Sequence, residues 1–127
     1  MSAKSDSAVL VVDDFEGVRD VASATLETEG YEVHTARTGE EALEILERHT
    51  GEILAVVLDL GLPGIGGEQT YREIRRLAPG LPVVLMSGDA AGGDVTREAE
   101  RRGPHTFLLK PFSPLELMQT LSELLAG

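Results

Sequence analysis

The pattern of apolar and polar positions divides the chain into regularly spaced blocks. Apolar runs rich in Val, Leu and Ile predict five short β-strands, at residues 8–12, 31–36, 53–58, 82–86 and 105–109. Continuous runs, such as Val-Leu-Val-Val at residues 9–12, are typical of strands buried on both faces of a parallel sheet. The second run alternates more between apolar and polar residues, which favours a place nearer a sheet edge.

Helical periodicity fills most of the gaps between these strands. Apolar side chains recur about every 3.6 residues in four segments, at residues 15–29, 38–49, 68–77 and 114–125. Thr38 with Glu41, and Ser113 with Glu116, predict capping boxes at two of the helix starts. Residues 92–102 carry few apolar side chains and many charges, so we expect a short helix of low stability there.

The spacing of the blocks predicts the fold. The expected strands begin about 22–29 residues apart, a length that suits βα units with right-handed crossovers. We therefore expect an α/β protein with a doubly wound (βα)₅ arrangement, in which five parallel strands lie in the order 2-1-3-4-5. Residues 1–7 are expected to be a disordered N-terminal tail, and residues 8–127 a single domain.

Composition narrows the class of protein. With 127 residues and 42% hydrophobic residues, the chain can bury one core. It has no Cys, which excludes disulfides, thiol catalysis and thiolate metal sites. A net charge of −11 argues against direct binding of nucleic acid. No apolar run approaches the roughly 20 residues of a membrane span, so we expect a cytoplasmic protein without membrane insertion.

Polar residues follow four of the five predicted strands. Asp13 and Asp14 come after the first, Asp59 after the third, Ser87 after the fourth and Lys110 after the fifth. Open α/β sheets form their sites outside the carboxyl ends of the strands. In the order 2-1-3-4-5 these four strands are neighbours. Three carboxylates, a hydroxyl and an ammonium group are therefore expected at one rim.

Each of these residues alone has a plainer interpretation. Asp13 or Asp14 could cap the first helix. Asp59 and Ser87 could be turn residues, and Lys110 a solvated surface lysine. The joint pattern favours a functional site, because every residue follows a strand and the side chains are chemically complementary.

The combination of groups suggests phosphoryl transfer. Three adjacent carboxylates repel one another unless a cation offsets them, and Mg²⁺ prefers oxygen ligands. A metal beside a carboxylate, a lysine and a hydroxyl suits a reaction in which the protein positions groups and neutralises phosphoryl oxygens. Asp59 would be the nucleophile that forms an acyl phosphate, and Ser87 and Lys110 would contact the phosphoryl oxygens.

These same residues lie in motifs that resemble response-regulator receiver domains of two-component signalling. The motifs are Val-Leu-Val-Val-Asp-Asp at 9–14, Val-Val-Leu-Asp-Leu-Gly-Leu-Pro-Gly with two further glycines at 56–67, Val-Val-Leu-Met-Ser-Gly at 83–88 and Phe-Leu-Leu-Lys-Pro-Phe at 107–112. The resemblance implies a CheY-like, flavodoxin-like fold over residues 8–127. It also implies phosphorelay signalling, with Mg²⁺-dependent transfer from a phosphohistidine to Asp59.

The resemblance assigns a role to each site residue. Asp13 and Asp14 match an acidic pair at the metal, Asp59 matches the phosphoacceptor and a metal ligand, and Gly61 matches a ligand through its backbone carbonyl.

The remaining roles concern the response to phosphorylation. Ser87 matches a switch hydroxyl, and Phe107 matches an aromatic residue that turns inward when that hydroxyl moves. Lys110 matches a lysine that contacts the phosphoryl group, and the Lys110–Pro111 bond matches one that is cis.

The resemblance also implies partners. The donor would be a sensor histidine kinase or a histidine phosphotransfer protein. A downstream protein, or a second copy in a dimer, would bind the face made by the fourth helix, fifth strand and fifth helix. The chain would be a signalling switch that catalyses only its own phosphorylation and dephosphorylation. Residues 85–89 and 107–112 also resemble receivers of hybrid histidine kinases.

Three other interpretations share part of this pattern. A phosphatase of the haloacid dehalogenase type requires Asp-x-Asp after the first strand, where this chain has Asp13-Asp14-Phe15. A flavin carrier of the same fold requires a loop rich in Ser, Thr and Gly at that position. The intact set of acidic residues, Ser87 and Lys110 argues against a binding module that works without phosphorylation, and sequence alone leaves that interpretation open.

Overall fold

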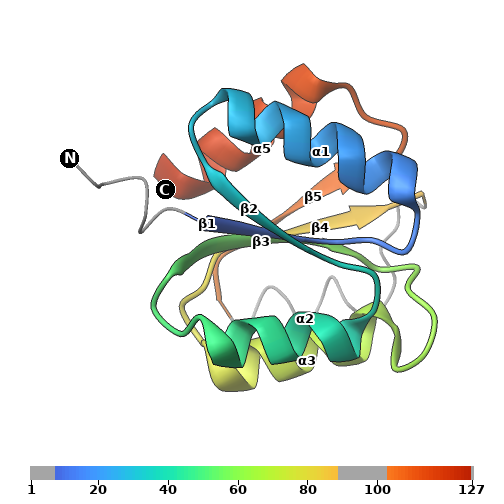
Figure 1. Ribbon diagram of the computed structural model, residues 1–127, viewed down its shortest axis with the longest axis vertical. Helices are drawn as coiled ribbons and strands as arrows, with labels where there is room; N and C mark the ends of the chain where they lie inside the picture. Colours follow the sequence, from blue (N-terminus) through green and yellow to red (C-terminus); the bar gives the residue numbers. More distant parts are fainter. Residues whose placement is uncertain (1–7, 89–102, 127) are drawn as a thin grey trace.

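The computed structural model describes residues 8–88 and 103–126, which form a parallel sheet covered by helices on both faces (Figure 1). The strands are β1 Ala8–Val12, β2 Glu32–Ala36, β3 Ile53–Asp59, β4 Val83–Ser87 and β5 His105–Leu109. Their order is β2-β1-β3-β4-β5, and every neighbouring pair is parallel. The predicted fold and strand order are confirmed. The expected tail at 1–7 and short helix at 92–102 lie outside the described residues.

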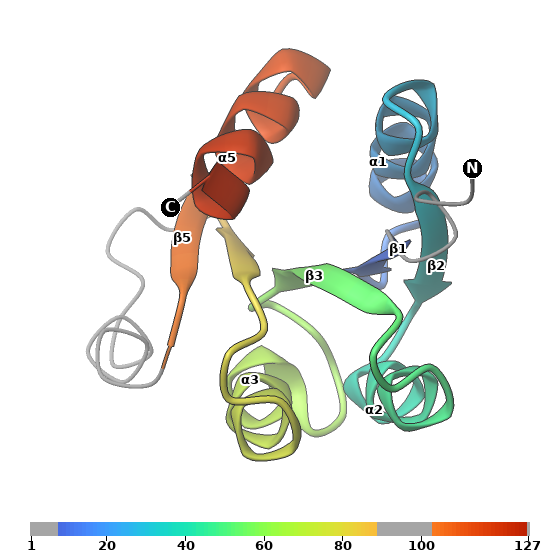
Figure 2. The ribbon, with the colours of Figure 1, turned by 90° about the vertical axis from the view of Figure 1, so that its left-hand side faces the viewer.

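The helices form the two outer layers. They are α1 Glu16–Thr28, α2 Gly39–Arg48, α3 Gly66–Leu77 and α5 Pro114–Ala126. Helices α1 and α5 cover one face of the sheet, and α2 and α3 cover the other (Figures 1 and 2). In the described part of the chain, no helix is both long enough and apolar enough to cross a membrane.

The strands divide the hydrophobic core into two halves because successive side chains point to opposite faces. Leu10 and Val12 pack on the side of α2 and α3, whereas Val9 and Val11 pack on the side of α1 and α5. All of β1 is buried, as the continuous apolar run predicts. In β2 the only fully buried residue is Ala36, which fits its position at the sheet edge.

The helix starts agree with most of the predicted caps. The Ser113 hydroxyl accepts from the Glu116 N–H at 3.1 Å, and the Glu116 carboxylate accepts from the Ser113 N–H at 2.8 Å, which completes the capping box of α5. At α2 the Thr38 hydroxyl accepts from the Glu41 N–H at 3.1 Å. The Glu41 carboxylate, however, accepts from the N–H of Arg37 at 2.7 Å and so reaches one residue further back.

Helix α3 begins at Gly66, earlier than the predicted start at residue 68. Two glycines discourage a helix by propensity, but here Gly66 adopts a positive φ of 84° and Gly67 lets the helix approach the strand end. An added Cβ at Gly67 would lie 2.4 Å from the Cα of Leu60. The first turn of α3 therefore packs directly against the backbone that follows Asp59.

Arg75 of α3 is almost fully buried, with 3% of its surface exposed. Its Nε donates to the hydroxyl of Tyr71 at 2.9 Å, and its Nη atoms donate to the carbonyl oxygens of Leu81 and Pro104. The guanidinium also lies over the Tyr71 ring. Arg75 thus ties the end of α3 to the segments that lead into β4 and β5.

Candidate functional site

Neighbouring strands carry the predicted site residues to one rim of the sheet. Asp13 directly follows β1, Asp59 ends β3, Ser87 ends β4 and Lys110 directly follows β5. Backbone hydrogen bonds join these ends: the N–H of Leu60 donates to Met86, and that of Lys110 donates to Ser87 at 2.8 Å. The convergence expected from the strand order is therefore present.

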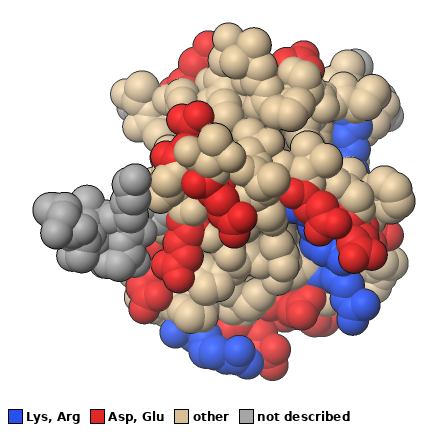
Figure 3. All heavy atoms as spheres, turned by 45° about the horizontal axis from the view of Figure 1, so that its top comes forward, with Lys and Arg blue, Asp and Glu red and all other residues tan. Residues whose placement is uncertain are grey.

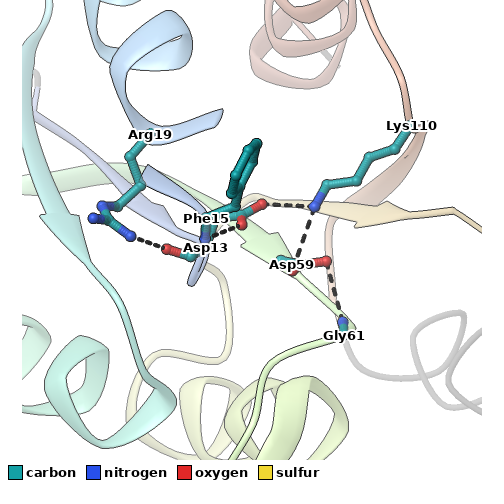
Figure 4. Close-up of polar contacts among 6 residues, drawn as sticks. All are labelled: Asp13, Phe15, Arg19, Asp59, Gly61 and Lys110. Carbon is teal, nitrogen blue, oxygen red and sulfur yellow. Dashed lines mark hydrogen bonds and ion pairs between the residues drawn. The ribbon is translucent and has the colours of Figure 1, made fainter. Parts of the chain in front are cut away.

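Asp13 is fully buried and is held from three directions (Figure 4). Its N–H donates to the carbonyl of Ala36 at 3.1 Å. Its Oδ1 accepts from the N–H of Phe15 at 2.9 Å, and its carbonyl oxygen accepts from Nη1 of Arg19 at 2.7 Å. Phe15 is the N-cap residue of helix α1, and its side chain makes no capping hydrogen bond. Asp13 therefore shapes the turn before α1 and leaves its Oδ2 directed elsewhere.

The Lys110 ammonium lies between two of the carboxylates. Its Nζ is 2.8 Å from Oδ2 of Asp13 and 3.4 Å from Oδ2 of Asp59 (Figure 4). The contact with Asp13 is an ion pair, and apart from Lys110 no described residue contacts Oδ2 of Asp13 as a donor. A buried carboxylate oxygen with a free lone pair is a position that a cation can fill.

Burial sets the electrostatics of the pair formed by Asp59 and Lys110. Burial raises the pKa of Asp59, and the charge of Asp13 raises it further. The N–H of Gly61 and the ammonium of Lys110 lower the pKa, but their effect is smaller, so the pKa stays above its ordinary value. For Lys110, burial lowers the pKa, but the bond to Asp13 and the charges of both carboxylates outweigh burial and raise it. The lysine therefore stays charged, while Asp59 holds its proton more readily than an exposed aspartate.

The three aspartates form a cluster with the composition of a metal site. One carboxylate oxygen from each of Asp13, Asp14 and Asp59 lies within 4.8 Å of the others. Asp14 is exposed, whereas the other two are buried, so the cluster opens to solvent on one side. Three carboxylates and an unsatisfied buried oxygen fit a hard divalent cation. The N–H of Gly61 donates to Oδ1 of Asp59 at 3.1 Å, and the ligand role of the Gly61 carbonyl stays a prediction.

The two predicted switch residues lie on neighbouring strands. Ser87 is half-buried at the end of β4. Phe107 of β5 is 36% exposed, and its ring contacts the ring of His105 edge-on at 5.8 Å. The aromatic side chain thus lies toward the outside of the sheet edge.

The Lys110–Pro111 peptide bond is cis, as predicted.

Arg19 is a site residue that the sequence analysis did not identify. It lies near the start of a helix, where the helix dipole disfavours a positive charge. A cation placed there, six residues after the first aspartate of a pair, is a signal that could have revealed its contact with Asp13.

Comparison with known proteins agrees with the fold and the acidic cluster described above. Residues 9–122 match the family described as response regulator receiver domain. The chain is 37% identical to the sensor kinase CckA of Brucella abortus over 119 residues, which is 94% of this chain and 12% of that protein. It is 32% identical over 92% of its length to the transcriptional regulatory protein GlrR of Escherichia coli and to the response regulator SaeR of Staphylococcus aureus. The chain spans 26% and 50% of those two relatives.

Solved structures agree with these relatives. The receiver domain of the hybrid histidine kinase CckA has a TM-score of 0.77 at 34% identity, with 93% of this chain and 98% of that chain covered. The receiver domain of NtrX from Brucella abortus has a TM-score of 0.81 at 32% identity, with 94% and 98% covered. A CheY-like receiver domain protein from Methanospirillum hungatei reaches 0.83 at 26% identity, with 94% of both covered. By its sequence, its sheet and the acidic rim that the sheet builds, this chain belongs to the family of response regulator receiver domains.

Proposed function

We propose that the chain is a phosphorylation-driven switch that takes a phosphoryl group from a phosphohistidine onto Asp59 in an Mg²⁺-dependent reaction. The observation that supports this most directly is the Lys110 ammonium, which contacts Asp13 and Asp59 beside a cluster of three carboxylates. A buried nucleophile, a nearby cation and a set of oxygen ligands are the groups that phosphoryl transfer requires.

Asp13, Asp14 and Asp59, with the carbonyl of Gly61, would hold the Mg²⁺. When bound, the ion neutralises charge on the phosphoryl oxygens and offsets the repulsion among the carboxylates. It would also favour the ionised form of Asp59, whose pKa burial raises.

In the transfer step, a carboxylate oxygen of Asp59 forms a bond to phosphorus while the bond between phosphorus and the donor's imidazole nitrogen breaks. The electron pair of that bond stays with the leaving imidazole. The N–H of Gly61 fixes Oδ1 of Asp59, and Lys110 contacts Oδ2. The Lys110 ammonium would exchange its contact with Asp59 for a phosphoryl oxygen, and the Ser87 hydroxyl would take a second phosphoryl oxygen.

A groove beside the site is suited to the phosphohistidine donor. Its volume is about 540 Å³, and it is lined by Phe15, Gly17, Val18 and Val21 of the α1 side and by residues 110–112. Phe15 is 65% exposed. An added Cβ at Gly17 would lie 3.1 Å from the Phe15 ring, so the glycine leaves room for that ring. The groove adjoins Lys110, and a partner seated there would reach the rim.

Charge favours a basic partner at this groove. Glu16 and Asp20 of α1 are exposed and are next in sequence to residues that line the groove. Figure 3 turns the side of α1 and α5 toward the reader and shows acidic side chains around uncharged areas. A helix of a sensor histidine kinase or a histidine phosphotransfer protein, with an apolar face flanked by Lys and Arg, would complement this surface.

The response would be a shift between two states. Movement of Ser87 toward the phosphoryl group would open space into which Phe107 turns from its outward position. The edge strand β5 would then present a changed surface. Leu109 of β5 is exposed there, which supports an output partner or a second copy bound through β5, α5 and the segment between β4 and β5.

The first test is labelling with acetyl phosphate and Mg²⁺, followed by intact mass. We expect one added phosphoryl group in the wild-type protein, and none in Asp59→Asn or in samples treated with chelator. Beryllofluoride binding provides a second measurement for a protein that small donors label slowly. A folded protein that takes up neither phosphoryl group nor beryllofluoride would contradict the proposal and favour a binding module that works without phosphorylation.

A further inference from the structure

Arg19 reaches back from α1 to the acidic rim. Its Nη1 donates to the carbonyl oxygen of Asp13 at 2.7 Å, across a separation of six residues (Figure 4). The side chain is partly buried, so this charge-assisted hydrogen bond is less exposed to competing water than a surface contact. Arg19 and Lys110 approach Asp13 from opposite sides.

The bond fixes more than one atom because a peptide group is planar. The carbonyl of Asp13 and the N–H of Asp14 belong to the same plane. Holding the carbonyl oxygen therefore sets the direction in which the Asp14 Cα leaves the turn. The N–H and Oδ1 of Asp13 are held by Ala36 and Phe15, and Oδ2 contacts Lys110. With Arg19 in place, every polar group of Asp13 has a contact, and the carboxylates of Asp13 and Asp14 lie close to that of Asp59.

The contact is also independent of the reaction at the carboxylates. In the proposed mechanism Lys110 changes partners when the phosphoryl group arrives. Arg19 binds a backbone oxygen and can keep its bond throughout. Its charge adds a second cation beside a cluster of three carboxylates, at a helix position that the dipole would otherwise disfavour.

We propose that Arg19 is a positioning residue for the divalent cation, because it holds the peptide plane between Asp13 and Asp14 in the orientation that the cation site needs. The inference rests on the proposed function and deepens it. It assigns a role to a residue that lies outside the acidic cluster and contacts neither the cation nor the phosphoryl group.

The test compares Arg19→Met and Arg19→Lys with the control Arg48→Met. Arg48 is an exposed arginine of α2 whose ion pair with Glu44 lies on the helix surface. We expect R19M to bind Mg²⁺ about tenfold more weakly in calorimetric titration, because residues that orient metal ligands typically contribute this much. R19K should fall between R19M and the wild-type protein, and R48M should match the wild-type protein.

Two further measurements separate positioning from general stability. The Mg²⁺ concentration for half-maximal labelling by acetyl phosphate should rise in R19M, while the rate at saturating Mg²⁺ recovers. In the metal-free protein the amide hydrogen of Phe15, which is bonded to Oδ1 of Asp13, should exchange faster in R19M and unchanged in R48M. If R19M does not fold, as judged by circular dichroism, R19K decides the question.

Unchanged Mg²⁺ affinity in the Arg19 variants, with a wild-type protein that binds Mg²⁺ and becomes labelled, would overturn this inference and leave the proposed function intact. A labelling rate in R19M that stays low at saturating Mg²⁺ would also overturn it. Failure of the wild-type protein itself to bind Mg²⁺ and to be labelled would instead overturn the proposed function, and the inference with it.

Discussion

At the scale of single residues, Asp59 combines two conflicting properties. In the proposed reaction it is ionised when it accepts a phosphoryl group, yet burial raises its pKa and the charge of Asp13 raises it further. A raised pKa means that the folded protein holds the proton more tightly than the unfolded chain does. Ionised Asp59 therefore lowers the stability of the metal-free fold at neutral pH. This destabilisation decreases as pH falls through the folded pKa toward the unfolded value.

Asp59→Asn should accordingly raise the melting temperature of the metal-free protein at neutral pH. The gain should shrink toward about pH 4, where the unfolded carboxyl group also takes up its proton. Circular dichroism melts at both pH values measure this effect. Asp20→Asn, which removes an exposed aspartate of α1, is the matched control and should change little.

With Mg²⁺ bound, the wild-type protein should melt at a higher temperature than Asp59→Asn. The ion should raise the melting temperature of the wild-type protein more than that of Asp59→Asn, because the substitution removes a proposed ligand. A metal-free Asp59→Asn protein that melts below the wild-type protein would show that the contact with Lys110 outweighs burial.

At the scale of elements, the buried guanidinium of Arg75 connects three segments. It joins the end of α3 to carbonyl groups before β4 and before β5, so one side chain sets how these segments meet. The same region is tightly packed, since an added Cβ at Gly103 would lie 2.5 Å from the carbonyl oxygen of Pro79.

Arg75→Met should destabilise the protein by about 3 kcal/mol, because it removes the guanidinium from the buried hydroxyl of Tyr71 and from the partly buried carbonyl oxygens of Leu81 and Pro104. Arg76→Met is the matched control on the same helix. Arg76 is exposed and pairs with Glu73 at the surface, so its loss should change stability by less than about 1 kcal/mol. Urea unfolding of both variants measures the difference, and equal effects would refute the role assigned to Arg75.

At the scale of the whole molecule, the proposed switch couples the rim to the edge of the sheet. Phe107 should become less exposed when the site is occupied. Since the chain has no Trp, Phe107→Trp provides a single fluorescent reporter. We expect its emission to shift to shorter wavelength on addition of Mg²⁺ and beryllofluoride.

Ser87→Ala in the Phe107→Trp background should abolish the shift, because the serine hydroxyl is the group proposed to move. Leu109→Trp, at an exposed position of the same strand, reports on general changes at the edge. Equal shifts from both reporters would argue against a specific inward movement at residue 107.

The sequence predicted the sheet and the positions of the site residues because both depend on local patterns. Apolar runs mark the strands, and a polar residue after a parallel strand is placed at the rim by topology. The start of α3 was predicted too late because Gly67 is required for close packing against Leu60 and Gly66 for a positive φ of 84°, and helix propensity reflects neither requirement. The contact of Arg19 is local, whereas the bond from Arg75 to Pro104 joins segments 29 residues apart, and helical periodicity shows only that Arg75 shares a face with Tyr71.

The backbone hydrogen bond from Lys110 to Ser87 places the site close to the edge strand of the sheet. It links the ends of β4 and β5, and the ladder pairs Leu85 with Phe107 two residues before Ser87. Neighbouring strands lie about 4.8 Å apart. Ser87 and Phe107 are therefore separated by one strand spacing across the sheet and by two residues along the strand. In the proposed switch, the conformational change that follows phosphorylation has to extend only that far. A protein that binds the sheet edge alone can therefore detect it.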